Sequence, residues 1–174
     1  MKAKSCAVGR TIRGGAALCL LAIGVAAHAD ATYKVHYVWT NSPHPGEPYN
    51  DWTNAAHEIQ TAVDYASADD TVRVTNGVYE SSGDGTNLVF INKALTLESV
   101  NGAEATILDG GGTNRCIFAR LANIIVAGFT LTNGVSCSTY NRGGGIFMRT
   151  TGLIRRCIIV GNEAGSGGGG GVSM

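Results

Sequence analysis

The chain has 174 residues, among them 25 glycines and three prolines, and its 13 basic and 13 acidic side chains cancel. This length allows one domain of ordinary size, while the glycine content lowers the expectation of a compact helical or doubly wound fold. The charge balance gives no indication of a polyanion-binding surface, and we expect no nucleic-acid partner.

Residues 1–29 are typical of a secretory signal peptide. The apolar run from Ala16 to Ala27 follows four basic residues, Lys2, Lys4, Arg10 and Arg13. It ends in Ala27-His28-Ala29, a small-x-small cleavage pattern, and it is too short to span a bilayer, so we expect no transmembrane segment. Cleavage leaves 9 basic and 13 acidic residues, a net charge of 9 − 13 = −4. We expect an exported protein that is secreted or held at the cell surface.

The block of residues 30–70 is predicted to contain a strand, a proline loop and a helix. Apolar and polar residues alternate from Tyr33 to Thr40, as in a strand, and all three prolines lie in the loop from Asn41 to Tyr49. From Trp52 onward, apolar residues recur at steps of three and four, which predicts an amphipathic helix over residues 54–66. The candidate caps of this helix are Asp51, Thr53 and Asn54.

Residues 71–174 repeat a strand followed by a glycine-containing turn. Apolar pairs with a period of two are predicted to point inward, at steps of 23, 34 and 28 residues: Val72/Val74, Leu95/Leu97, Phe129/Leu131 and Cys157/Ile159. Further strands are expected between these pairs, from Val89 to Ile91, Thr106 to Leu108, Cys116 to Phe118, Ile124 to Val126 and Ile146 to Met148. Val172 is expected to begin another strand.

Asparagine and glycine mark the expected turns after these strands. Both residues tolerate left-handed backbone, and they follow all four apolar pairs. We therefore assign a structural turn role to Asn76, Gly77, Asn101, Gly102, Asn133, Gly134 and Asn162. Asn133 and Asn162 are also candidates for hydrogen bonds between coils.

The spacing of the strands predicts a solenoid. Strands about 25 to 35 residues apart, with no helical period between them, do not form strand-helix-strand units. A unit of this length cannot bury its apolar face alone, so copies must stack in parallel register. We predict an all-β right-handed parallel β-helix whose N-terminal end is covered by the amphipathic helix. Because the chain stops at Met174 after a glycine run, we expect the coils to be truncated there and to continue in later coils.

Several motifs carry a family resemblance: His36-Tyr37-Val38, Asp70-Thr71-Val72, Asn76-Gly77-Val78-Tyr79, Ile91-Asn92-Lys93 and Leu108-Asp109-Gly110-Gly111-Gly112. They resemble the first coils of bacterial secreted right-handed parallel β-helix proteins of the pectin-lyase-like superfamily. A second likeness, in Gly144-Gly145-Ile146 and Ile159-Val160-Gly161-Asn162, is to polymorphic outer-membrane proteins. The first resemblance implies an exported solenoid and, where such proteins are enzymes, cleavage of acidic polysaccharides.

The sequence offers few groups for that chemistry. Hydrolysis needs two neighbouring carboxylates, and the adjacent pair Asp69-Asp70 is expected to be a turn between the helix and the first coil. Elimination needs a base and usually calcium, yet after Asp109 the only acidic residue is Glu163. The histidines His36, His44 and His57 are expected to be unrelated surface residues. We expect no catalytic site, metal site or cofactor in these residues; whether the protein is an enzyme stays open.

A binding surface is the remaining candidate site. Phe147 and Arg149 should point outward, because they alternate with Ile146 and Met148. With Arg156, which belongs to a cluster of arginines in the last coils, they are the candidate glycan-binding residues. Cys157 is expected to be a small buried residue, and Cys137, in a loop, is the cysteine open to reaction.

Three functions are compatible with these features. The first is a structural or adhesive rod at the cell surface. The second is a noncatalytic surface that binds a polysaccharide or a cell-surface glycan. The third is a polysaccharide lyase or glycoside hydrolase whose active coils lie beyond residue 174.

Overall fold

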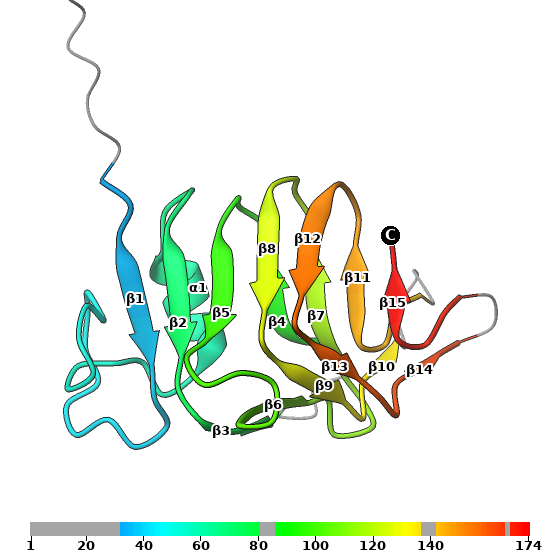
Figure 1. The fold of residues 1–174 in the computed structure, drawn as a ribbon, viewed down its shortest axis with the longest axis horizontal. Coiled ribbons are helices and arrows are strands. Elements are labelled where there is room, and N and C mark those ends of the chain that lie inside the picture. The colour runs from blue at the N-terminus through cyan, green and yellow to red at the C-terminus, as the bar shows by residue number, and fades with distance from the viewer. Residues whose placement is uncertain (1–31, 81–85, 137–141, 166–167) are drawn as a thin grey trace, which may run out of the picture. The chain divides into compact units, whose positions relative to one another are not determined.

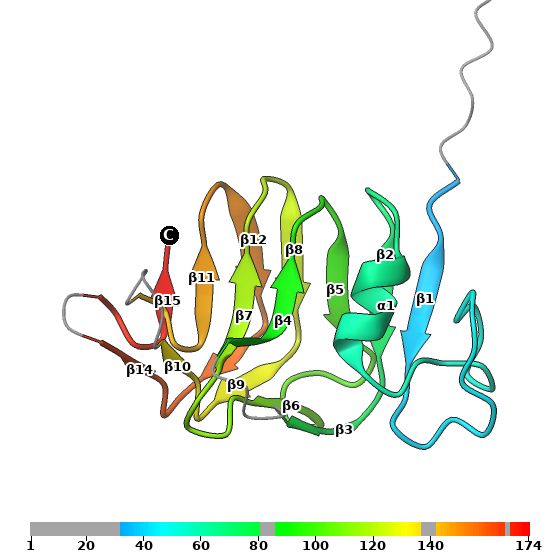
Figure 2. The ribbon, with the colours of Figure 1, turned by 180° about the vertical axis from the view of Figure 1, so that it is seen from behind.

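The computed structural model describes residues 32–80, 86–136, 142–165 and 168–174. In this part of the chain, parallel strands form three larger sheets and one two-stranded sheet, and there is one short helix. The five-stranded sheet, called sheet A, faces the viewer in Figure 1. One of the two four-stranded sheets, called sheet C, faces the viewer in Figure 2, the view from behind.

Each larger sheet takes one strand from every coil. Sheet A contains β1 (Val35–Val38), β2 (Thr71–Val74), β5 (Thr96–Ser99), β8 (Ile124–Ala127) and β12 (Gly152–Arg155). Sheet B contains β3 (Gly77–Glu80), β6 (Thr106–Asp109), β9 (Thr130–Thr132) and β13 (Ile158–Ile159). Sheet C contains β4 (Asn87–Ile91), β7 (Arg115–Ala119), β11 (Ile146–Met148) and β15 (Val172–Ser173). The small sheet pairs β10 (Val135–Ser136) with β14 (Glu163–Ala164).

The chain winds through sheets A, B and C in turn and then returns to sheet A. Starting at β2, it comes back to sheet A at β5, at β8 and at β12, which makes three full turns, and it then continues through β13 and β15. The strand pairs within the sheets are parallel. The prediction of an all-β parallel solenoid is therefore confirmed.

The core of the solenoid consists of rows of inward side chains in register. In sheet A, Val72 pairs with Leu97 and Leu97 with Val126, and all three are fully buried. Equivalent rows run through sheet B at Tyr79, Leu108 and Leu131, and through sheet C at Val89, Ile117 and Ile146. Burial of one such aliphatic side chain stabilises a fold by about 1.5–3 kcal/mol. The packing of these rows between coils is therefore the main interaction that stabilises the solenoid.

The four apolar pairs seen in the sequence belong to two different sheets. Val72 and Leu97 lie in sheet A, whereas Leu131 pairs with Ile159 in sheet B. The step of 34 residues from Leu95 to Phe129 therefore joins two sheets and is not a repeat length. Cys157 and Ile159 point toward the core but are only half-buried, since no described coil follows them.

The helix is shorter than predicted. Helix α1 spans Ile59–Tyr65 rather than residues 54–66. Asp51, a predicted cap, instead accepts hydrogen bonds from the backbone N–H groups of Thr53 and Asn54 at 2.7 and 3.0 Å, and such local bonds compete with helix formation. Ala56 is extended, and its N–H group donates to the carbonyl oxygen of Tyr37 in β1 at 2.9 Å. The predicted apolar face is nevertheless buried at Ile59, Ala62 and Val63.

The asparagines lie at the corners of the coils. Asn101 Nδ2 donates to Asn76 Oδ1 at 2.7 Å and so links successive coils where sheet A turns into sheet B. Gly77 is not a turn residue but begins β3. Asn162 Oδ1 accepts from the Gly134 N–H at 2.7 Å, and Asn133 Nδ2 donates to Asp109 Oδ2 at 2.9 Å.

Glycine is required where coils meet beyond sheet B. A Cβ atom at Gly144 would overlap the carbonyl oxygens of Glu163 and Gly134, which belong to neighbouring segments of the stack. The glycine runs of the repeat therefore allow backbones to approach closely at this corner.

Candidate functional site

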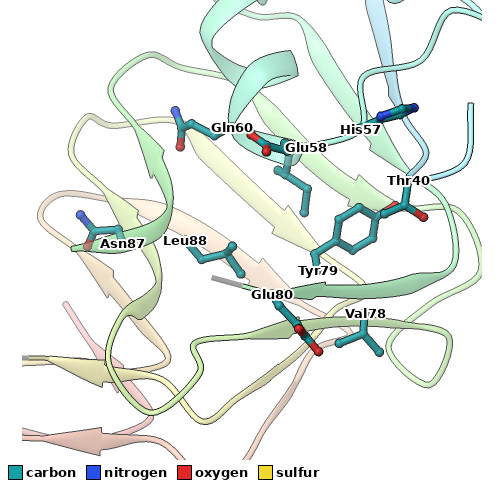
Figure 3. Close-up of a pocket in the computed structure, with 10 residues that line it drawn as sticks. Thr40, His57, Glu58, Gln60, Val78, Tyr79, Glu80, Asn87 and Leu88 are labelled. Carbon is teal, nitrogen blue, oxygen red and sulfur yellow. The ribbon is translucent and has the colours of Figure 1, made fainter. Parts of the chain in front are cut away.

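A cavity of about 530 Å³ opens beside the first strands of sheets B and C (Figure 3). This volume lies within the range of about 300–1,000 Å³ that is common for ligand sites. Three segments line the cavity: the block before β2, strand β3 and strand β4. Their lining residues are Thr40, His57, Glu58, Ile59, Gln60, Val78, Tyr79, Glu80, Asn87 and Leu88.

The floor of this cavity includes Tyr79, whose ring belongs to the inward row of sheet B. Its side chain is 5% exposed, and its hydroxyl donates to the Thr75 carbonyl oxygen at 3.2 Å. Burial raises the pKa of Tyr79 to about 12, so the phenol stays neutral. We assign Tyr79 a structural role rather than that of an acid or base.

The rim of the cavity is polar and acidic. Glu58 and Glu80 are exposed, and Figure 3 shows that they come from opposite walls, one from the start of α1 and one from the end of β3. Asn87 is held in place, because its Oδ1 accepts from Arg115 Nη1 at 2.8 Å. His57 Nε2 lies 3.0 Å from the carbonyl oxygen of Ser42, which can only accept, so this nitrogen carries a proton.

Aliphatic side chains complete the cavity. Val78 is 49% exposed, and Leu88 is partly buried against the core. The arrangement therefore combines two carboxylates, neutral hydrogen-bonding groups and apolar surface. Such a site can hold an extended polar ligand or one with positive charge. Sequence reasoning missed it, because its walls come from segments up to 48 residues apart, from Thr40 to Leu88.

The predicted glycan-binding residues are not gathered into one site. Phe147 points out of sheet C as expected, but it is only 5% exposed and stacks on Phe118 at 5.4 Å between ring centroids. Arg149 and Arg156 are exposed. They lie at opposite ends of β12, and a four-residue strand is about 13 Å long.

Arg115 is a buried cation that the sequence did not reveal. It is 3% exposed, and its guanidinium carbon lies 5.5 Å from the Phe118 ring centroid and 5.4 Å from that of Phe147. The side chain also donates to Gly143 O at 2.9 Å and to Ser136 Oγ at 2.7 Å. Burial lowers the pKa of Arg115, but an arginine remains charged. Arg115 therefore ties the outer face of sheet C to the segment before β11.

His36 and Asp70 differ from their expected roles. His36 was expected at the surface but is 2% exposed, and Asp70, expected in a turn, is 4% exposed. The two side chains bond to each other, and Asp70 Oδ1 also accepts from the Lys34 N–H at 2.9 Å. Asp69 is exposed with φ of 69°, so the adjacent carboxylates have different surroundings. This arrangement is structural and does not form the paired acids of a hydrolase.

The cysteines also divide into different environments. Cys116 is fully buried, and burial raises the pKa of its thiol to about 12. Cys157 is half-buried rather than buried as expected. Cys137, the expected reactive cysteine, lies outside the described residues.

In the part of the chain that the structure describes, no helix has the length and apolarity needed to cross a bilayer. Nor do three or more His, Cys, Asp or Glu side chains come together there as a set of metal ligands. Comparison with known proteins finds no family model, no curated protein and no solved structure that matches this chain.

Proposed function

We propose that this protein is an exported structural or adhesive β-helix of the pectin-lyase-like type, secreted or held at the cell surface. The observation that supports this most is the set of in-register, buried rows in all three sheets. Such rows make a rigid scaffold whose outward positions are free to vary and to contact other molecules. The signal-like residues 1–29 support export.

The proposal includes a right-handed winding and a capping role for α1. Crossover connections between parallel strands of one sheet are right-handed in about 98% of cases. For the capping role, support comes from the buried side chains of α1 and from Gln60, which bonds to the backbone of Phe90 in β4. Figure 2 shows α1 next to β4 at the end of sheet C. A crystal structure with left-handed coils would contradict the first part.

Noncatalytic glycan binding is a second candidate. It is favoured by the exposed Arg149, Arg155 and Arg156 near the last described coil, where Glu163 is the only acidic residue after Asp109 in the sequence. Such a surface would attract acidic polysaccharides. Phe147, the third candidate glycan-binding residue, is only 5% exposed, so its ring offers little surface to a sugar.

Two assays test these proposals. Expression with the native leader, followed by fractionation and mass spectrometry, should find the chain outside the cytoplasm with its N-terminus at Asp30. An absorbance assay for unsaturated uronates on polygalacturonate and alginate should give no product. Cytoplasmic retention of an intact leader would contradict export. Product that disappears in Arg149→Ala or Arg156→Ala would instead show a polysaccharide lyase.

A further inference from the structure

The block before β2 closes the first strands of sheets A and C. In sheet A, the Tyr37 N–H donates to the Tyr49 carbonyl oxygen at 2.7 Å, and the Ala56 N–H donates to the Tyr37 carbonyl oxygen at 2.9 Å. In sheet C, Gln60 Oε1 accepts from the Phe90 N–H at 2.7 Å, and Gln60 Nε2 donates to the Phe90 carbonyl oxygen at 3.2 Å. The backbone edges of β1 and β4 therefore have hydrogen-bond partners.

The first strand of sheet B is left open. Sheet B ends at β3 among the described residues. The Gly77 N–H donates to Ala105 O at 3.0 Å, so Gly77 and Tyr79 direct their backbone groups toward β6. Because backbone groups alternate in direction along a strand, Val78 and Glu80 direct theirs to the opposite side. That side is where the 530 Å³ cavity lies (Figure 3).

We propose that this cavity binds an extended peptide that carries a basic side chain and pairs with β3 as an added strand. Free N–H and C=O groups in strand geometry complement another extended backbone, which is the general basis of β-strand addition. The cavity supplies both requirements of such a site, an open strand edge and pockets for side chains. The exposed Val78 and the neighbouring Leu88 offer apolar contact.

The negative charge of the cavity rim favours a basic peptide over an acidic one. The exposed carboxylates of Glu58 and Glu80 lie on the rim of the cavity. The block of residues 32–70, which supplies Thr40 and residues 57–60 to the cavity lining, contains one lysine and six acidic residues, a net charge of 1 − 6 = −5 with histidine neutral. A lysine or arginine side chain beside the added strand would approach these carboxylates, whereas an acidic peptide would be repelled.

The test uses the full chain and a blocked peptide of about five residues, with a central lysine flanked by valine and threonine. Binding is titrated by calorimetry, and exchange of the Val78 amide is followed by NMR. We expect saturable binding that slows exchange at Val78. The variant Glu58→Gln/Glu80→Gln should bind about fivefold more weakly or worse, while Glu104→Gln, an exposed change on a later coil, should bind normally.

Two peptide controls separate backbone pairing from simple charge attraction. N-methylation of the alternate amides that face β3 should abolish binding, and methylation of the other amides should not. A matched peptide with central glutamate should bind much more weakly. The proposal is overturned if the lysine peptide does not bind, if both methylated peptides bind equally, or if the glutamate peptide binds as well. Export of the protein is unaffected by any of these outcomes, so the two proposals fail separately.

Discussion

His36 and Asp70 form a buried pair in which Nε2 of the imidazole lies 3.1 Å from Oδ2 of the carboxylate. The other ring nitrogen, Nδ1, lies 2.9 Å from the carbonyl oxygen of Pro48, which can only accept. Nδ1 therefore carries a proton and donates to Pro48, while Nε2 faces the Asp70 carboxylate. This pair joins β1 to the residue that precedes β2.

Stability should fall in acid because of Asp70. Burial acts to raise the pKa of Asp70, but hydrogen bonds from Lys34, His36 and Ser67 outweigh it and leave the pKa below its ordinary value. A folded pKa below the unfolded value of about 3.9 means that the carboxylate stabilises the fold above that pH. This contribution is lost as the pH falls through the folded pKa. Urea unfolding should give a lower free energy of unfolding at about pH 2 than at about pH 6.

The variant Asp70→Asn tests the source of that acid sensitivity. It should cost about 3 kcal/mol at neutral pH, since it leaves a buried imidazole without its charged partner, and it should reduce the loss in acid. Asp69→Asn is the matched control, because Asp69 is exposed and asparagine tolerates its positive φ. Equal acid sensitivity in Asp70→Asn and the natural chain would show that other carboxylates dominate.

Replacement of Gln60 should loosen the first strand of sheet C. Gln60→Leu keeps the size of the side chain but removes the partners of the Phe90 N–H and carbonyl groups. We expect a loss of about 1–3 kcal/mol in the free energy of unfolding, measured by urea titration. Thr61→Leu, on the exposed side of α1, should cost much less. Equal effects of the two changes would mean that the Gln60 contacts do not stabilise the fold.

Replacing Arg115 with lysine should destabilise the folded protein. Arg115→Lys keeps the charge but cannot donate to Gly143, Ser136 and Asn87 at once, and it loses the planar contact with the phenylalanine rings. Thermal unfolding should show a loss of about 2 kcal/mol. Arg120 is exposed on the turn after β7, so the control variant Arg120→Lys should unfold at nearly the same temperature as the natural chain. If both variants unfold alike, the buried network contributes nothing to stability.

Thiol labelling should distinguish Cys116 from Cys157. The Cys116 thiol is buried with a pKa of about 12, so almost none is thiolate at neutral pH. Peptide mapping after treatment with iodoacetamide should find Cys157 modified in the folded protein and Cys116 only after unfolding. Labelling of Cys116 at the rate of Cys157 in the folded protein would contradict the burial of its thiol.

Local periodicity was enough to predict most strands, but not the sheet to which each belongs. Inward apolar pairs look alike in every sheet, so Leu97 of sheet A and Leu131 of sheet B were taken as copies of one position. The early start predicted for the helix has a similar cause: Ala55 and Ala56 are buried, but Ala56 is buried through pairing with β1. Periodicity detects burial and does not tell which neighbour provides it.

The roles of the site residues could not be predicted from local sequence patterns, because they arise from contacts between distant parts of the chain. His36 bonds to Asp70 across 34 residues and Arg115 to Gly143 across 28. The cavity beside β3 arises because the block before β2 closes two sheets and leaves the third open. The left-handed positions at Gly102 and Asn133, in contrast, were predictable because their backbone requirement is local.

Residue-resolved amide exchange is the sharpest test of a parallel solenoid that is closed at β1 and β4 and open at β3. We expect slow exchange at Tyr37 and Phe90, whose N–H groups donate to Tyr49 O and Gln60 Oε1, and at Tyr79, whose N–H group faces β6. We expect fast exchange at Val78, the neighbour of Tyr79 on the same strand, in the absence of peptide. Equal protection of Val78 and Tyr79, or fast exchange at Phe90, would contradict it.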